Sequence, residues 1–495
     1  MISFSAVSTP LKGIRADVVA MFVPQDVKML KAALAGITKL SPDVATAVAS
    51  SSFTGKLKET LVLFPAKTSF RRLVLAGTGM PSGLAPEKLR RAAAAVVKTI
   101  ADLSPRSLAL VEPEGTGMPV ESIANALAEG VLLSSYRFDK YLTVEKKPST
   151  LRTASVVCAQ KSSVADAKRG LLLADATCAG TILARDLANA PANEIYPESL
   201  ASRTRRAAKG FSVKVLDERR IQSLGMGGLI GVSLGSNRPP RFIIMEYRPR
   251  GGDLPTVVLV GKGVTFDSGG VSIKPAAGMS EMKMDMSGAA AVIGTMTAAA
   301  RLGIRVHLVG LVPATENMLG GSAMKPGDII THMNGKTSEV DNTDAEGRLI
   351  LADALTYADR YKPDLVIDLA TLTGACVVAL GNVASGMMGN TQKHMDRLKE
   401  AGERTHERVW QLPLFEEYEQ QIKSDVADVK NVGGRWAGAI TAGLFLKKFI
   451  GKYNWIHIDI AGPAILEEER EYIPKGGSGV GVRLLIDFLN HWKEN

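Results

Sequence analysis

Four carboxylates in glycine-rich surroundings are the side chains of this sequence best suited to chemistry. They are Asp267, Asp285, Asp344 and Glu346. Brought together, such groups would repel one another strongly unless cations lay between them. Two divalent cations would balance the charge, and ions paired roughly 3.5–4 Å apart clamp the attacking and leaving groups of a reaction. The four residues are therefore candidate ligands of a two-metal site.

The spacing of Asp344, Glu346 and Arg348 supports this interpretation. At i, i+2 and i+4 of an extended chain the three side chains point to one side, with only an alanine and a glycine between them. Each acid also has a structural alternative, since loop aspartates are common turn formers and helix N-caps. Asp285, just ahead of a Ser-Gly pair, fits such a cap. Spacing alone leaves open whether the four acids converge.

Three other motifs are weaker. Residues 231–235 have the G-x-S-x-G form of a nucleophile elbow, but the stretch before Ser233 has the composition of a loop or helix end rather than a strand. A serine hydrolase acting through Ser233 is kept as an alternative. Residues 335–337 lack the first glycine of a phosphate loop, and residues 261–263 lack the third glycine of a dinucleotide motif, so both are rejected.

Alternating strands and helices must position these residues. Strands are expected at Thr256 to Val260, Val306 to Leu311, Leu365 to Ala370 and Trp455 to Ile460, and helices at Arg169 to Ala188, Ser287 to Leu302, Arg348 to Arg360, Ala439 to Phe449 and up to Trp492. Such alternation predicts a mainly parallel sheet with helices on both faces. In sheets of this kind, sites gather at the carboxyl ends of the strands.

The first 150 residues read as a separate α/β domain without a chemical motif. Strands are expected at Val18 to Val23, Leu61 to Phe64 and Arg72 to Ala76, and helices at Pro86 to Leu103 and Val120 to Leu132. A boundary begins near Lys146-Lys147-Pro148. We therefore predict an α/β protein of two domains, each a mainly parallel sheet flanked by helices. Residues 1–150 form the non-catalytic domain, 151–190 a linker and connecting helix, and 191–495 the larger catalytic domain.

Length and composition exclude several classes of protein. The chain has 495 residues, 46% of them hydrophobic and 22% charged, which is typical of globular proteins with more than one domain. No apolar run reaches the roughly 18 residues of a membrane span, and no signal peptide is evident. Three widely spaced cysteines form no disulfide framework. These features predict a cytoplasmic protein with no membrane partner.

The net charge of +10 is distributed unevenly along the chain. Basic residues are in excess over residues 1–250, and acidic residues over the remainder. A basic surface can bind nucleic acid, so a DNA-binding regulator is the alternative function. An ordinary solvated surface is the favoured explanation, because aromatic residues do not interleave with these bases.

At its acidic segments the sequence resembles the leucyl aminopeptidase family, the two-metal cytosolic peptidases also called M17. The resemblance rests on residues 260–274, 282–290, 342–349, 368–374 and 459–462, and it covers the chain from about residue 170 to the end. The first 150 residues match more loosely. The resemblance implies a metal-dependent aminopeptidase that removes N-terminal residues from peptides, with leucine and other large apolar residues preferred.

The resemblance also implies roles for individual residues. The implied metal ligands are Lys262, Asp267, Asp285 and Glu346 for the tighter-binding ion, and Asp267, Asp344 and Glu346 for the exchangeable one. Lys274 would polarise the scissile carbonyl, and Arg348 would hold a bicarbonate that acts as general base. Lys262 can ligate only when neutral, and adjacent dications would depress its pKa. Oxygen-rich ligands with one nitrogen suit several divalent metals, among which Zn and Mn are expected.

Substrate contacts and assembly follow from the same resemblance. Thr371, Leu372 and Gly374 would line the substrate backbone, while Met282 and Ala464 would line the side-chain pocket. Both pocket residues are apolar, and a methionine adapts to large aliphatic side chains, although core-filling residues would look the same. The resemblance further implies a homo-oligomer, a hexamer with its catalytic domains inside.

Overall fold

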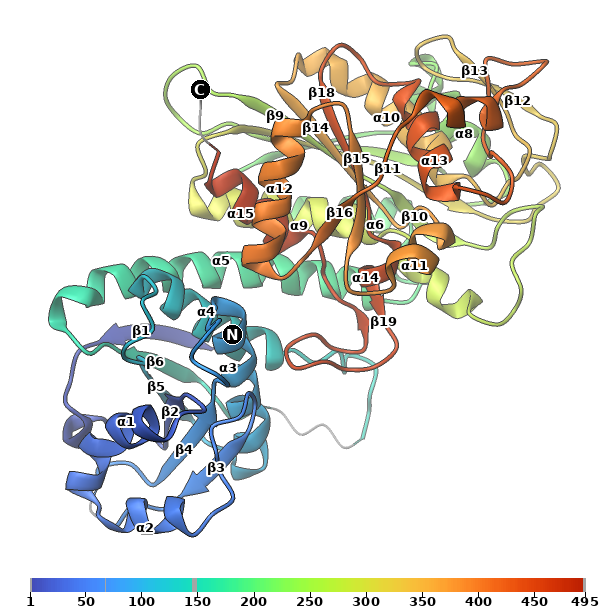
Figure 1. The fold of residues 1–495 in the computed structure, drawn as a ribbon. Helices are drawn as coiled ribbons and strands as arrows, with labels where there is room; N and C mark the ends of the chain where they lie inside the picture. The colour runs from blue at the N-terminus through green and yellow to red at the C-terminus, as the bar shows by residue number, and fades with distance from the viewer. Residues whose placement is uncertain (1, 67, 145–148, 493–495) are drawn as a thin grey trace. The chain divides into compact units, whose positions relative to one another are not determined.

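The computed structural model describes residues 2–66, 68–144 and 149–492 and is drawn in Figure 1. The chain forms two compact units, Met1–Cys178 with Glu469–Pro474, and Ala179–Glu468 with Lys475–Asn495. The boundary expected at Lys146-Lys147-Pro148 lies outside the described residues. Among the residues described, no helix combines the length and apolar character needed to cross a bilayer.

The first unit is built on a parallel sheet with one antiparallel edge. Its strands are β1 (Ser3–Val7), β2 (Val18–Val23), β3 (Thr60–Leu63), β4 (Arg72–Gly77), β5 (Ser107–Val111) and β6 (Thr153–Val157), in the order β1-β6-β5-β2-β4-β3. Only β3 runs antiparallel to its neighbour. The helices are α1 (Val27–Leu40), α2 (Asp43–Ala49), α3 (Pro86–Ile100), α4 (Val120–Ser134) and the start of α5 (Val164–Asn189). Strand β6 lies within the segment expected to be linker.

Two cores cover the two faces of this sheet. Residues 18, 20 and 22 of β2 pack with α3 and α4, while residues 19, 21 and 23 pack with α1 and α2. That alternation is the period of a strand buried on both sides. Helix α1 begins at Asp26, whose side chain accepts a 2.8 Å hydrogen bond from the Met29 backbone N–H.

The segment Glu469–Pro474 is held to the first unit by ion pairs. Glu471 lies 2.9 Å from the Lys58 ammonium and 2.8 Å from the Arg91 guanidinium. Burial by itself raises the pKa of Glu471, but the hydrogen bonds from Lys58 and Arg91 outweigh it and lower this pKa to about 2.

The second unit contains a larger mixed sheet. Its strands are β7 (Ser212–Leu216), β8 (Arg241–Tyr247), β9 (Thr256–Gly261), β10 (Gly263–Asp267), β11 (His307–Asn317), β14 (Leu365–Ala370), β15 (Ser385–Gly389), β16 (Val409–Gln411) and β18 (Asn454–Asp459). Their order is β16-β15-β18-β14-β9-β11-β8-β7, with β10 paired to β11. The central strands β18, β14, β9, β11 and β10 are parallel. Antiparallel β8 and β7 form one edge.

Smaller elements complete this unit. The helices are α6 (Pro197–Ala207), α7 (Glu218–Ser223), α8 (Gly227–Ser233), α9 (Ser287–Leu302), α10 (Gly347–Ala358), α11 (Gly374–Leu380), α12 (Gln392–Thr405), α13 (Gly438–Lys447), α14 (Ala461–Ala464) and α15 (Val482–Asn490). Short strands are β12 (Ile329–Thr331), β13 (Thr337–Glu339) and β17 (Val429–Lys430) in one small sheet, and β19 (Ile465–Leu466) and β20 (Gly476–Gly477) in another.

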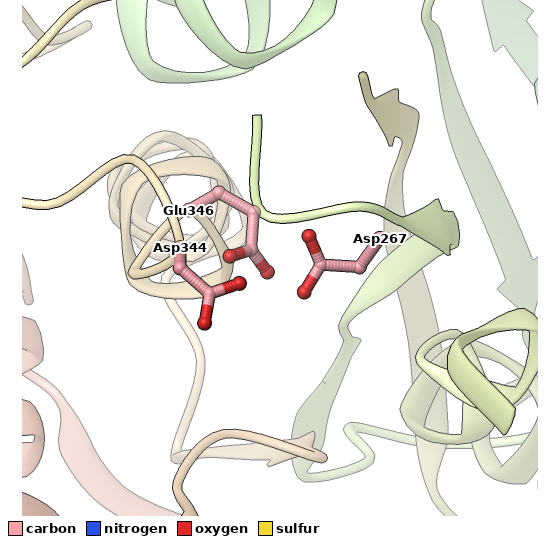
Figure 2. A group of neighbouring side chains, drawn as sticks. All are labelled: Asp267, Asp344 and Glu346. Atoms are coloured by element: carbon pink, nitrogen blue, oxygen red, sulfur yellow. The ribbon is translucent and has the colours of Figure 1, made fainter. Parts of the chain in front are cut away.

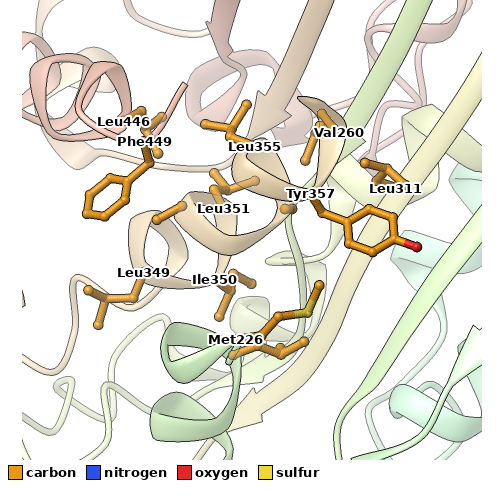
Figure 3. Close-up of a cluster of buried hydrophobic side chains, with 14 of the residues drawn as sticks. Met226, Val260, Leu311, Leu349, Ile350, Leu351, Leu355, Tyr357, Leu446 and Phe449 are labelled. Carbon is orange, nitrogen blue, oxygen red and sulfur yellow. The ribbon is translucent and has the colours of Figure 1, made fainter. Parts of the chain in front are cut away.

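Helices α9 and α10 cover opposite faces of the larger sheet. Leu311 of β11 belongs to the apolar core that contains α10, α8 and α13, and Figure 3 shows Leu351 and Leu355 of α10 among these side chains. The neighbouring Gly310 faces Val292 and Met296 of α9 instead. The two helices therefore begin on either side of the same sheet, close to the carboxyl ends of its central strands.

The expected alternation of strands and helices is confirmed, with changes at the ends of elements. Strand β2 matches its expected bounds, and β9 and β14 match closely. Strand β11 continues past its expected end at Leu311 to Asn317, because β8 and β10 still pair with it there. The stretch before Ser233, expected to be a loop or helix end rather than a strand, is helix α8.

Candidate active site

The candidate residues gather where the central parallel strands end. Lys262 directly follows β9, and Asp267 is the last residue of β10. Thr371 follows β14, and Asp459 ends β18. Because these strands are parallel neighbours or pair through β11, their carboxyl ends lie along one edge of the sheet. The expected location of the site is thus where the chemistry-bearing residues are found.

Three of the predicted acids converge at this edge. Carboxylate oxygens of Asp267, Asp344 and Glu346 all lie within 4.8 Å of one another. Figure 2 shows Asp344 and Glu346 at the start of α10, facing Asp267 on the end of β10. Asp267 and Glu346 are buried, whereas Asp344 is partly exposed. The convergence that spacing left open is therefore present.

Lys262 joins the fourth acid to this cluster. Its Nζ donates to Asp285 Oδ1 at 2.8 Å and to the Thr371 carbonyl at 3.0 Å, and it lies 2.9 Å from Glu346 Oε1. Burial by itself lowers the pKa of Lys262, but the carboxylates of Asp285 and Glu346 outweigh it and the pKa is raised. Lys262 is thus the positive centre of a buried acidic group.

Lys274 approaches the same cluster from the other side. Its Nζ lies 3.0 Å from Asp267 Oδ2 and 2.5 Å from Asp344 Oδ1. Its side chain is 21% exposed, against 4% for Lys262. Burial by itself lowers the pKa of Lys274, but the adjacent carboxylates outweigh this effect. The net shift is upward, so the group stays an ammonium. The two lysines therefore divide the cluster into a buried half and an accessible half.

Burial raises the carboxylate pKa values in spite of these lysines. The pKa of Glu346 is raised by burial and by the charge of Asp267, and Lys262 offsets only part of this rise. Burial likewise raises the pKa of Asp285 and of Asp344, with Asp267 adding to both shifts. The site therefore holds more negative charge than its own ammonium groups neutralise.

Asn317, which lies outside the predicted set, and Thr371, predicted as a substrate contact, both orient the cluster. Asn317 Nδ2 donates to Asp267 Oδ1 at 2.8 Å and to the Thr343 carbonyl at 3.1 Å. The Thr371 hydroxyl donates to Asp285 Oδ1 at 2.7 Å. Each hydrogen bond fixes one carboxylate oxygen, while the second oxygen faces a lysine of the cluster, Lys274 for Asp267 and Lys262 for Asp285.

Asp459 orients the loop that contains the predicted substrate contacts. Its Oδ1 accepts the Leu372 N–H at 3.1 Å, and its Oδ2 accepts the Thr373 hydroxyl at 2.7 Å. Thr373 in turn caps α11, which begins at Gly374. The segment with Asp459 was used for the family resemblance without a role for this residue. Asn317 gave no signal in the sequence that distinguished it from other buried polar residues.

The geometry expected for Asp344, Glu346 and Arg348 is wrong. Glu346 has φ −76° and ψ −34°, and α10 begins directly after it, so this segment is a turn and a helix start instead of an extended chain. The Asn342 side chain causes the turn by accepting the Asp344 N–H at 2.8 Å. Asp344 and Glu346 meet through this turn, while Arg348 lies in the first turn of the helix.

Two structural alternatives are also settled. Helix α9 has Met286 at its N-cap and no side-chain cap, so Asp285 does not serve as one. Ser233 is the last residue of α8, is 5% exposed, and donates its hydroxyl to the Ile230 carbonyl at 2.7 Å. A nucleophile elbow needs an exposed serine between a strand and a helix. The serine-hydrolase alternative is therefore wrong.

The close approach of α10 to Lys262 depends on Gly347. A Cβ atom at this position would lie 2.5 Å from Lys262 Cε and 2.8 Å from its Nζ. No side chain larger than hydrogen fits there without moving the lysine. The glycine between Glu346 and Arg348 is thus needed for the position of the amine.

Arg348 is buried beside the cluster. Its Nη1 donates to the Asn431 carbonyl at 2.5 Å, and its Nε has no hydrogen-bond partner among the described residues. Burial lowers the pKa of Arg348 to about 10, although Glu346 and Asp459 act in the opposite direction. A cationic group with an unused donor remains at the rim of the acidic cluster.

The predicted pocket residues lie on neighbouring segments. Met282 belongs to the 3-10 helix Met279–Met284 that leads into Asp285. Ala464 ends α14, which follows β18, and is 1% exposed. Both segments therefore start or end at the same edge of the sheet as the acids.

The residues present fit a divalent cation. The buried oxygens Asp285 Oδ2, Asp344 Oδ1 and Glu346 Oε1 face lysine ammonium groups at 2.8, 2.5 and 2.9 Å, and they have no other described partner. Four clustered carboxylates outnumber these two ammonium groups, and hard cations with oxygen ligands suit such a set. The excess negative charge described above points the same way.

Comparison with known proteins agrees with this geometry. The family description "Cytosol aminopeptidase family, catalytic domain" matches residues 182–486, and the corresponding N-terminal domain matches residues 18–145. The chain belongs to the cytosol aminopeptidase family. It is accordingly an aminopeptidase, a hydrolase that fits peptide substrates, and the resemblance noted in the sequence is confirmed.

Individual relatives of the family cover most of this chain. A probable cytosol aminopeptidase of Geobacter sp. (strain M21) is 48% identical over 88% of this chain and 89% of its own length. One from Chlorobium limicola is 44% identical and covers 99% of this chain and 100% of its own.

Solved structures of two relatives share the cytosol aminopeptidase fold. A mutant of tomato leucine aminopeptidase is 33% identical, with a TM-score of 0.87 over 99% of this chain and 96% of its own. The bottromycin maturation enzyme BotP in complex with Mn is 36% identical, with a TM-score of 0.84 over 96% of this chain and 99% of its own. The predicted two-domain α/β fold is thus confirmed.

Proposed function

We propose that this aminopeptidase uses two divalent metal ions, Mn or Zn, to remove leucine and other large apolar residues from peptide N-termini. The observation that supports the proposal most is the convergence of Asp267, Asp344 and Glu346 within 4.8 Å, flanked by two lysines. The manganese complex of BotP, a structural relative, makes Mn a reasonable first choice.

The proposed ligands fall into two sets. Lys262, Asp267, Asp285 and Glu346 hold the tighter-binding ion, while Asp267, Asp344 and Glu346 hold the exchangeable one. When bound, such ions would acidify a water molecule and polarise the scissile carbonyl. Lys262 must give up its proton to ligate, and the positive charge of a dication favours this loss. Its contacts with Asp285 and Glu346 already aim the amine into the cluster.

Lys274 and Arg348 are the proposed catalytic residues. Lys274 remains charged and stabilises the negative charge that develops on the carbonyl oxygen. Its raised pKa and its partly exposed position suit this role. Arg348 holds a bicarbonate as general base, an assignment supported by its buried guanidinium and unpaired Nε.

The substrate backbone is proposed to lie along residues 371–374. The Leu372 N–H is already bonded to Asp459, so this residue offers its carbonyl to the peptide. Thr371 and Gly374 complete the backbone contacts, and Met282 and Ala464 line the pocket for the first side chain. An adaptable methionine favours large aliphatic residues there.

A homo-oligomer, specifically a hexamer with the catalytic domains inside, is also part of the proposal. Large apolar side chains are exposed on or next to adjoining elements of the second unit. Val378 of α11 is 90% exposed, Trp436 ahead of α13 is 73% exposed, and Phe415 is 62% exposed. Exposed apolar groups of this kind often mark protein interfaces. Light scattering during gel filtration measures the assembly directly.

Three further assignments complete the proposal. The first unit is proposed to be the non-catalytic domain and the second unit the catalytic domain, while residues 151–190, expected to be a linker and connecting helix, contribute β6 to the first sheet and contain all of α5. The relatives' designation as cytosol aminopeptidases supports a cytoplasmic location. A gel shift of duplex DNA that weakens with salt would instead support the alternative of a DNA-binding role for the basic residues 1–250.

One assay tests the core of the proposal. Leucine p-nitroanilide and its N-acetylated form are compared with and without a chelator. Hydrolysis of the free-amine substrate alone, abolished by the chelator and restored by Mn or Zn, is the expected result. Equal hydrolysis of both substrates, or activity that a chelator does not reduce, contradicts it.

A further inference from the structure

Asn431 is a fully buried residue that lies outside the predicted set of site residues. It follows β17, is 0% exposed, and donates its backbone N–H to the Glu339 carbonyl at 2.9 Å. Its side chain forms hydrogen bonds with the backbone of residues 341–345, the segment that leads into α10. One asparagine thus holds a loop that is distant from it in sequence.

The contacts span the whole loop. Oδ1 accepts the Asp341 N–H at 2.8 Å and the Asn342 N–H at 3.3 Å. Nδ2 donates to the Asn342 carbonyl at 2.7 Å and to the Ala345 carbonyl at 3.4 Å. The loop is therefore fixed on both sides of Asp344, one of the converging acids.

The backbone of Asn431 reaches a second functional group. Its carbonyl accepts the 2.5 Å hydrogen bond from Arg348 Nη1. Because Arg348 has no partner at Nε, this bond is its main anchor within the described residues. A shift of Asn431 would consequently move Asp344 and Arg348 together.

Only an amide satisfies this arrangement. It offers one acceptor oxygen and a two-proton donor in a single plane. An aspartate would set an oxygen against the carbonyls of Asn342 and Ala345, and a shorter side chain would leave buried backbone groups unpaired.

We infer that Asn431 is a positioning residue of the active site, which holds the Asp344 loop and Arg348 in the geometry for metal binding and turnover. It touches neither the acidic cluster nor the substrate-binding loop through any described contact, so it acts through the backbone. The inference rests on the proposed roles of Asp344 and Arg348.

The experiment compares the wild type with Asn431→Asp and Asn431→Ser. Mn²⁺ affinity and stoichiometry are measured by competition with a chelating dye, kcat and KM with leucine p-nitroanilide at saturating Mn²⁺, and folding by thermal unfolding. Loss of an outer partner of a metal ligand typically weakens affinity or activity 10- to 100-fold. We expect about tenfold weaker binding of one Mn²⁺ and at least about a tenfold loss of kcat, with KM changed less.

Asn390→Asp is the matched control. Asn390, which is exposed where Asn431 is buried, makes the same kind of amide bridge, with Nδ2 donating to the Tyr453 carbonyl at 3.0 Å and Oδ1 accepting the Trp455 N–H at 2.7 Å, and it has no described hydrogen bond to a candidate site residue. It should lower the unfolding temperature without changing Mn²⁺ affinity or kcat. Should Asn431→Asp fail to fold, the serine variant decides.

The outcomes separate the two proposals. A folded Asn431 variant with wild-type Mn²⁺ affinity and kcat overturns the positioning role, while the proposed function stands. A wild type that binds no Mn²⁺ or Zn²⁺ and needs none for hydrolysis overturns the proposed function, and the positioning role fails with it. If the Asn390 and Asn431 variants lose Mn²⁺ affinity and kcat to the same extent, the effect is one of general stability, and the inference is also overturned.

Discussion

Lys262 and Lys274 are predicted to respond differently to the same substitution, although both contact the acidic cluster. Lys262→Ala removes an amine that is 4% exposed and lies 2.8 Å from Asp285 and 2.9 Å from Glu346. Removing one partner of a buried pair leaves an uncompensated charge and costs about 3–5 kcal/mol. If the amine is also a ligand, occupancy of the tighter metal site falls at the same time.

Lys274→Ala should leave both metals bound. Its Nζ lies 3.0 Å from Asp267 and 2.5 Å from Asp344 on the accessible side, where the proposed ions themselves neutralise the acids. What is lost is the charge that faces the carbonyl oxygen. Removal of one such donor costs about 10²–10³ in kcat, or roughly 2.7–4 kcal/mol. KM should move less, because the interaction is strongest in the transition state.

The assay measures bound metal per subunit, kcat and KM at saturating Mn²⁺, and the unfolding temperature of each variant. Lys325→Ala is the control, since this lysine is 67% exposed and pairs only at the surface with Asp328. It should change none of the measured quantities. If Lys274→Ala strips a metal while Lys262→Ala retains both, the assignment of the two lysines is reversed and the reasoning is refuted.

Further predictions concern the glycine beside the amine, the acids, the metals and acid stability. Gly347→Ala should reduce metal occupancy and activity, because its Cβ would lie 2.5 Å from the side chain of the neighbouring lysine, whereas Gly321→Ala, with open space around it, should not; wild-type kcat in the first variant would contradict this. Asp344→Asn and Glu346→Gln should each lose metal and rate, and full occupancy with unchanged kcat in either would remove it from the ligand set. Dialysis against a chelator should abolish activity and added Mn²⁺ or Zn²⁺ should restore it; undiminished turnover by verified metal-free protein would be incompatible with metal catalysis. Because the pKa of Glu471 is lowered from 4.5 to about 2 in the fold, its stabilising effect is present above pH 4.5 and is lost as the pH falls towards 2. Glu471→Gln should therefore lower the unfolding temperature at pH 7 by a degree or so, since partly exposed pairs contribute about 0–1 kcal/mol, and the difference from wild type should vanish near pH 2; a constant difference across that range would contradict the assignment.

Much of this site follows from the sequence because its residues lie at predictable structural positions. The strand before Lys262 and the helix after Glu346 have strong periodic signals, and parallel strands place their carboxyl ends together. The local path between Asp344 and Arg348 was not predictable in the same way. An Asx turn at Asn342 replaces the extended chain there, and such turns compete closely with extended conformations in short polar segments.

The contacts of Asn431 and Asn317 were beyond reach for a different reason. Each forms hydrogen bonds with a segment that is distant in sequence, and the periodicity of hydrophobic residues gives no information about such long-range contacts. A buried asparagine between short elements has the same composition whether it holds a catalytic loop or fills an ordinary turn. Only the tertiary arrangement distinguishes these cases, because it determines which backbone groups the amide meets.

The fold itself supplies too little positive charge to balance the carboxylates of the cluster. Asp285 lies two residues before α9 and Glu346 occupies the N-cap position of α10, so both acids lie near the positive ends of helix dipoles. Such an end stabilises a carboxylate by about 0.3–1 kcal/mol. Lys262 adds a full charge within 3 Å of both acids. Even so, burial and the charge of Asp267 leave the pKa of Asp285 and of Glu346 raised. Helix ends and lysines together therefore do not offset the effect of burial on these acids, and divalent ions, which the cluster fits, would supply further positive charge.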